Sequence, residues 1–270
     1  MVYFSWLVFA VYGITTYLYW KQFIKDSKDS YKTSHYWLTA AVAVHGVFIL
    51  SIMFSLSRLP IATVSESIQT FVWITAALYL LLEKHLKEHS QGALILSLLL
   101  ILLFISNITF KLSQSINPIL YDVKFETHVF SMLLANSGFM LAFIASVLHL
   151  LLSNEIKKKE LGIFFRRLPS LVYFEKISNY AINIGLIFLA IGFMLGIYSA
   201  AQVWSESLLT DPKIVSVLLT LLIYFIHYIG RKMGKITGQR AAIISIIGFV
   251  SIMISYLVVS NIIPGEHHFG

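Results

Sequence analysis

Long apolar runs alternate with short polar segments along the whole chain. Eight of these runs are predicted to be helical spans, at about 2–20, 37–57, 67–83, 92–110, 128–152, 178–203, 213–230 and 240–262. Each run is close to the roughly 20 residues that a helix needs to cross a bilayer. The pattern therefore predicts an all-α fold, a polytopic membrane helix bundle of about eight transmembrane helices in a lipid bilayer.

The composition agrees with a membrane protein and excludes a soluble enzyme. Of the 270 residues, 58% are hydrophobic and 12% are charged, whereas soluble domains have about 25% charged residues. Eight spans leave no room for a separate aqueous domain, so residues 1–270 are predicted to form one transmembrane domain. The chain has no cysteine, which excludes disulfides, thiolate metal sites and a cysteine nucleophile.

The distribution of basic residues predicts the orientation. Of the 20 basic residues, 16 follow the first, third, fifth and seventh runs: Lys21, Lys25, Lys28, Lys32, Lys84, Lys87, Lys157, Lys158, Lys159, Arg166, Arg167, Lys176, Arg231, Lys232, Lys235 and Arg240. Basic residues concentrate on the cytoplasmic side of membrane proteins, so both termini are predicted to face outside. Because the charges are divided among four short connections, they do not indicate a nucleic-acid partner.

Local motifs add three expectations. Thr63 and Glu66 have the spacing of a capping box at the start of the third span. Gly192 and Gly196 form a GxxxG pair in the sixth span, which is typical of close helix packing. The segment 154–177 combines basic and apolar residues, and it fits either a helix on the cytoplasmic leaflet or a solvated loop.

The nine histidines are the main candidates for chemistry. His45 lies near the middle of the second span, where an ionisable side chain is costly unless it has a partner. His128 is at the outer end of the fifth span, and His267 follows the eighth. His149 and His227 are interpreted as residues at the membrane boundary. The residues interpreted as solvated are His35, His85 and His89. His268 is next to His267 in the sequence.

Haem ligation is the chemistry that this histidine pattern suggests. Two imidazoles on opposite faces of a porphyrin fill both axial positions of its iron, and His128 and His267 are predicted to be on the same side of the membrane. The alternative is that both are exposed interfacial residues without a ligand. For His45, a further intramembrane candidate, the alternative is a neutral imidazole that is hydrogen-bonded to a neighbouring helix.

Other chemistries lack support in the sequence. There is no glycine-rich phosphate loop, no HExxH and no GxSxG motif. We therefore expect a protein that is not an enzyme and has no catalytic residues.

The segment AAQVWSESLLTDPK at 200–213 resembles the tryptophan-rich external segment of CcsA-type cytochrome c assembly proteins. Trp204 and Asp211 match the family pattern, whereas Leu208 and Thr210 replace two of its tryptophans. The closing PGEHHFG resembles the family's terminal motif and aligns its ligand histidine with His267. The resemblance implies eight spans and an external haem site formed by His128, His267, Trp204 and Asp211.

Within that family, the short chain and the lost tryptophans resemble the HemX-type branch. This branch implies a multi-pass protein of the bacterial cytoplasmic membrane that regulates haem biosynthesis by lowering the level of glutamyl-tRNA reductase, directly or indirectly. The first alternative is a haem-handling or transport component of cytochrome c assembly, and the second is a structural membrane adaptor. The basic inner connections are where a soluble partner is expected to dock.

Overall fold

The computed structural model describes residues 1–25, 29–110, 112, 118–159, 162–203 and 212–261. Within these residues the secondary structure is helical: α1 (Val2–Lys25), α2 (Asp29–Leu56), α3 (Val64–Leu86), α4 (Gly92–Ile108), the short 3-10 helix η1 (Pro118–Tyr121), α5 (Val123–Lys158), α6 (Ile163–Arg167), α7 (Leu171–Val203), α8 (Pro212–Lys232) and α9 (Gly238–Asn261). Seven helices are long and apolar enough to cross a membrane, and α4 is a shorter apolar helix. The prediction of an all-α polytopic membrane protein is confirmed.

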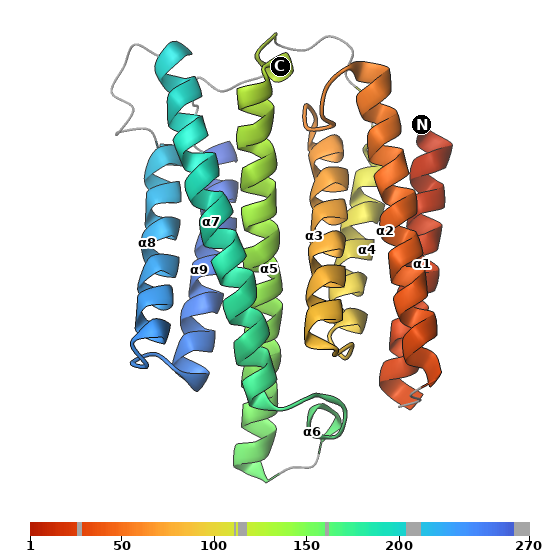
Figure 1. Cartoon of the computed structure of the whole chain (residues 1–270), viewed down its shortest axis with the longest axis vertical. Coiled ribbons are helices and arrows are strands. Elements are labelled where there is room, and N and C mark those ends of the chain that lie inside the picture. The colour runs from red at the N-terminus through yellow and green to blue at the C-terminus, as the bar shows by residue number, and fades with distance from the viewer. Residues whose placement is uncertain (26–28, 111, 113–117, 160–161, 204–211, 262–270) are drawn as a thin grey trace. The chain divides into compact units, whose positions relative to one another are not determined.

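Contacts divide the chain into two compact units, which are described separately. Unit 1 comprises residues 1–115 and 158–169. In it, α1 packs against α2 and α4, and α3 packs against α2 and α4. Figure 1 shows consecutive helices of this unit running in opposite directions, so the end of α1, the start of α2, the end of α3 and the start of α4 lie at one end.

Unit 2 comprises residues 116–157 and 170–270. Its α7, α8 and α9 pack against one another, and the rings of Phe139 in α5 and Tyr224 in α8 stack with their centroids 3.9 Å apart. The helices again alternate in direction (Figure 1). The start of α5, the end of α7, the start of α8 and the end of α9 therefore lie at the same end of this unit.

Small residues bring α5 and α7 into close contact. A Cβ atom at Gly138 would lie 2.6 Å from the carbonyl oxygen of Ala181, and one at Gly185 would lie 2.6 Å from the Phe139 ring. In a bilayer, such small residues allow the dispersion contacts that hold helices together. The close packing predicted for the GxxxG pair is confirmed at Gly192, where a Cβ atom would lie 2.9 Å from Sδ of Met132. Exposed apolar residues such as Ile187 and Met194 leave part of α7 uncovered.

The segment 154–177 contains one short helix between two long ones. The fifth span continues to Lys158, α6 occupies only Ile163–Arg167, and α7 begins at Leu171. Leu168 is extended, with φ −94° and ψ 150°, because the proline that follows disfavours helical geometry in the preceding residue. The alternative of a loop without a helix is therefore wrong for Ile163–Arg167, and the position of this short helix on the cytoplasmic leaflet stays a prediction.

The N-cap of the predicted capping box at the start of α3 is confirmed. Thr63 has extended backbone angles, and its hydroxyl accepts a hydrogen bond from the Glu66 backbone N–H at 3.2 Å. This contact satisfies one of the amides that a helix leaves unpaired in its first turn. The Glu66 side chain also binds Arg58 and the backbone N–H of Ala62.

Candidate functional site

The start of α5 places His128 in the second turn of that helix. Asp122 precedes the helix, and its Oδ1 accepts hydrogen bonds from the backbone N–H groups of Lys124 at 2.7 Å and Phe125 at 3.2 Å. An aspartate at this position caps the free amides of the first turn. The local sequence therefore fixes where α5 begins and where His128 lies on it.

The imidazole of His128 rests against the backbone of α7. Its Nδ1 lies 2.6 Å from the carbonyl oxygen of Gly192, so Nδ1 carries the hydrogen and donates it. A Cβ atom at Gly196 would lie 2.6 Å from Cε1 of this ring. The GxxxG pair thus has a specific purpose here, because it makes room for the imidazole between the two helices.

This hydrogen bond determines what His128 can do chemically. With the hydrogen on Nδ1, the lone pair is on Nε2, which is then free to bind a metal ion. Histidines that ligate metals almost always donate the other ring N–H to a carbonyl or carboxylate in this way. The side chain is only half-buried, so the described structure fits an axial haem ligand at this position.

The other predicted members of the external site, Trp204, Asp211 and His267, lie outside the described residues. The helix ends that precede or follow them are described. Trp204 directly follows the end of α7, Asp211 directly precedes α8, and His267 comes six residues after the end of α9. All three helix ends are at the same end of unit 2 as the start of α5 (Figure 1).

His45, the intramembrane candidate, is fully buried in unit 1. Its Nδ1 lies 3.3 Å from the Tyr12 hydroxyl in α1, and the two rings meet edge to face. Its Nε2 has no hydrogen bond within 3.5 Å, and the Gln69 side chain is close to it. The structure therefore pairs His45 with a neighbouring helix, and a ligand role for it stays a prediction.

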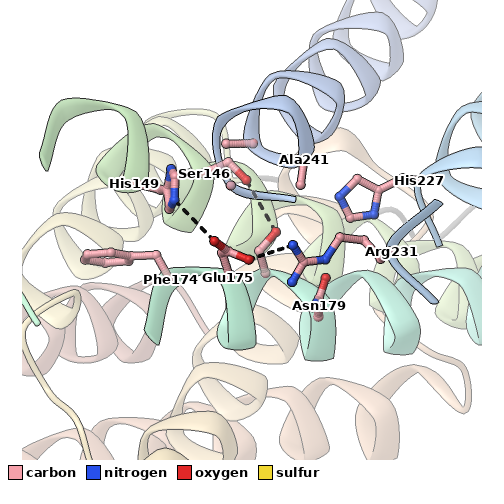
Figure 2. Close-up of a pocket in the computed structure, with 11 residues that line it drawn as sticks. Ser146, His149, Phe174, Glu175, Asn179, His227, Arg231 and Ala241 are labelled. Carbon is pink, nitrogen blue, oxygen red and sulfur yellow. Dashed lines mark hydrogen bonds and ion pairs between the residues drawn. The ribbon is translucent and has the colours of Figure 1, made fainter. Parts of the chain in front are cut away.

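His149 and His227 line a narrow pocket at the other end of unit 2 (Figure 2). Between them is Glu175 of α7, whose Oε2 accepts a hydrogen bond from Nη1 of Arg231 at 2.6 Å. Oε1 of the same carboxylate is 3.7 Å from Nε2 of His149. Both histidines are buried, so their side chains face the interior of unit 2, and their interpretation as residues near the membrane boundary stays a prediction.

A buried ion pair in unit 1 was not predicted from the sequence. Arg58 Nη1 donates to Glu66 Oε2 at 2.7 Å, and Nη2 donates to Oε1 at 3.0 Å. Neither side chain is exposed. Arg58 precedes the capping box and Glu66 belongs to it. An acid three residues after a helix cap is the sequence signal that could have suggested a second role for Glu66.

A second unpredicted cluster lies at the opposite end of unit 1. Glu83 is buried near the end of α3 and contacts His35, His89 and Tyr19. His35 and His89 are half-buried against Glu83 and only partly solvated, whereas His85 is exposed, as expected. Glu83 itself was the available signal, since an acid at the end of an apolar span needs a partner.

The known proteins to which this chain is similar are described as cytochrome c assembly or biogenesis proteins. The family model for Cytochrome C assembly protein matches residues 61–267. The cytochrome c biogenesis protein CcsA of Chlorella vulgaris is 23% identical over 97% of this chain and 94% of its own length. The protein of the same name from Mesostigma viride is 25% identical over 80% of this chain and 79% of its own.

The protein of that name from Chlamydomonas reinhardtii is 28% identical over 78% of this chain. The match spans 61% of that relative, which is less than two thirds of its length. These relatives all carry the CcsA name, so the comparisons support the wider family and not the HemX-type branch in particular.

Proposed function

Because the chain belongs to the cytochrome c assembly protein family, we propose that it is a haem-handling component of cytochrome c assembly. In this proposal it is a multi-pass protein of the bacterial cytoplasmic membrane that binds and presents haem without catalysing a reaction. His128 and His267 bind the haem at the outer face, and the segment containing Trp204 and Asp211 lies beside it. The relatives' name supports this reading above the regulatory one.

The observation that carries the proposal is the hydrogen bond from His128 Nδ1 to the Gly192 carbonyl, at 2.6 Å. When bound, haem supplies an iron that accepts one imidazole on each face. The bond to Gly192 holds the His128 ring in one tautomer and one orientation, with Nε2 as the ligand atom. His128 is thereby positioned in advance, and less conformational entropy is lost when haem binds.

The test is an absorption spectrum of the protein purified in detergent from haem-replete cells. We expect a Soret band that is shifted or lost in His128→Ala and in His267→Ala, with partial recovery in external imidazole. His268→Ala should have a smaller effect, because His267 is the position that matches the family motif. An unchanged spectrum in the His128→Ala/His267→Ala double variant would refute the proposal of an external haem site at these histidines.

A sharper variant leaves both histidines in place. Gly196→Ala places a methyl group 2.6 Å from Cε1 of His128, so the ring must move, and we expect lower haem occupancy or a shifted Soret band. Gly13→Ala is the matched control, because a Cβ atom there meets nothing within 4 Å. Equal spectra for the two variants would contradict positioning of the imidazole by α7.

Regulation of haem biosynthesis is the second candidate function. It is favoured by Leu208 and Thr210, which replace two tryptophans of the family segment and reduce the aromatic surface available to a porphyrin. Under this alternative, deletion raises the level of glutamyl-tRNA reductase and leaves covalent cytochrome c normal. Under the proposed function, deletion abolishes covalent cytochrome c and leaves the reductase unchanged.

A further inference from the structure

Glu83 is a fully buried carboxylate at the end of unit 1 that carries basic connections. The Tyr19 hydroxyl in α1 donates a hydrogen bond to its Oε2 at 2.7 Å. Tyr19 passes over the start of α4 to reach it, since a Cβ atom at Gly92 would overlap the Tyr19 ring. One oxygen of the carboxylate is thus held in place, and the other, Oε1, faces two imidazoles.

Oε1 is contacted by two imidazoles, that of His35 and that of His89, which come from different elements. Nδ1 of His35 in α2 lies 2.8 Å from Oε1, and Nδ1 of His89 lies 2.9 Å from the same atom. In the described part of the chain, the ligand atoms of His35, Glu83 and His89 all lie within 4.8 Å of one another. Two nitrogens and one carboxylate oxygen are a common ligand set for zinc and similar ions.

The turn between α3 and α4 explains why His89 returns to Glu83. Lys87 ends α3 in the left-handed conformation, with φ 54° and ψ 39°, and its N–H donates to the Glu83 carbonyl. Glu88 Oε1 then accepts hydrogen bonds from the backbone N–H groups of His89 and Ser90. The backbone around His89 is therefore fixed locally, before any ion binds.

We propose that His35, Glu83 and His89 bind one divalent transition-metal ion, for which zinc is the test ion. Each imidazole nitrogen would have to move slightly away from Oε1, from 2.8 and 2.9 Å to the distance of about 3.4 Å between the ligands of a tetrahedral zinc ion. Each imidazole then carries its hydrogen on Nε2. A fourth position is open to water, and the ion can enter from solvent, since the His35 and His89 side chains are 30% and 19% exposed.

Tyr19 is a positioning residue of this site. Its hydroxyl binds the carboxylate oxygen that does not face the imidazoles, so it orients Oε1 without touching the ion. Outer partners of this kind typically contribute 10-fold to 100-fold, roughly, to metal affinity. The site joins α2 to α3 and to the turn after α3. Metal binding in unit 1 does not depend on the proposed haem site of unit 2.

The experiment uses the full chain in detergent, without a histidine tag, stripped with a chelator and then equilibrated with buffered Zn²⁺. We expect one zinc ion per chain that is absent from His35→Gln and His89→Gln and retained in His85→Gln. The control is matched, because His85 is an exposed histidine two residues from Glu83. Tyr19→Phe should bind zinc about 10-fold more weakly.

Two further measurements apply to the unmodified protein, so they do not depend on whether a variant folds. Zn²⁺ should raise the melting temperature in proportion to the logarithm of its concentration, and Co²⁺ should give the visible absorption of a four-coordinate ion with nitrogen and oxygen ligands. Equal zinc content in wild type and His89→Gln, or no zinc above that of the stripped protein, would overturn the proposal. The cluster would then be a hydrogen-bond network only.

Discussion

The buried ion pair between Arg58 and Glu66 makes a quantitative prediction about stability. Glu66→Gln keeps the size and shape of the side chain and removes its charge. Oε2 accepts hydrogen bonds from Arg58 Nη1 and from the Ala62 backbone N–H, and Oε1 accepts one from Arg58 Nη2. Because Arg58 donates to both oxygens, the NH₂ group of the new amide faces a guanidinium donor at either position, and at least one of these hydrogen bonds is lost.

The magnitude follows from the burial of both side chains. Glu66→Gln leaves a guanidinium that is not exposed to solvent and has no counter-charge from residue 66. Breaking a buried pair by changing one partner costs about 3–5 kcal/mol. At about 2–4 °C per kcal/mol for a chain of this size, the melting temperature should fall by roughly 6–20 °C.

The assay is thermal unfolding in detergent of wild type, Glu66→Gln, Arg58→Met and the double variant. The double variant should lose less stability than the sum of the single variants, by about 1–3 kcal/mol, because it leaves no unpaired charge. Glu155→Gln is a control on a half-buried acid and should cost less than about 1 kcal/mol. A Glu66→Gln protein that melts within 2 °C of wild type, or strictly additive effects, would refute the reasoning.

Three other predictions concern orientation and packing. A reporter fused after Gly270 should be active only outside the cytoplasm, as the distribution of basic residues requires; activity inside would contradict the predicted topology. Gly92→Ala should destabilise unit 1 by about 1–3 kcal/mol in thermal unfolding, because its methyl group overlaps the Tyr19 ring; an unchanged melting temperature would show that the ring can move at no cost. Glu175→Gln should lower stability by only about 1 kcal/mol, because its ion pair with Arg231 is partly exposed, and a loss above 3 kcal/mol would be incompatible with that exposure.

Part of the candidate site could be predicted from the sequence because it depends on residue type and local position. The charge and motif around His128 identify it as an outer histidine at the start of a span. The role of Gly196 could not be predicted, since the GxxxG spacing indicates close approach but not which side chain fills the space. The structure places the His128 ring there, because α5 and α7 are rotated so that these faces meet.

The positions of the long helices could be predicted from the residue pattern alone. In a bilayer each span must satisfy its backbone hydrogen bonds within its own segment, so hydropathy and a cap such as Thr63 suffice to locate an element. The side-chain partners could not be predicted in this way and are visible only in the folded structure. His35 and Glu83 are 48 residues apart in sequence and 2.8 Å apart in space, and that contact depends on how each helix is rotated and shifted against its neighbours, which no local pattern of residues encodes.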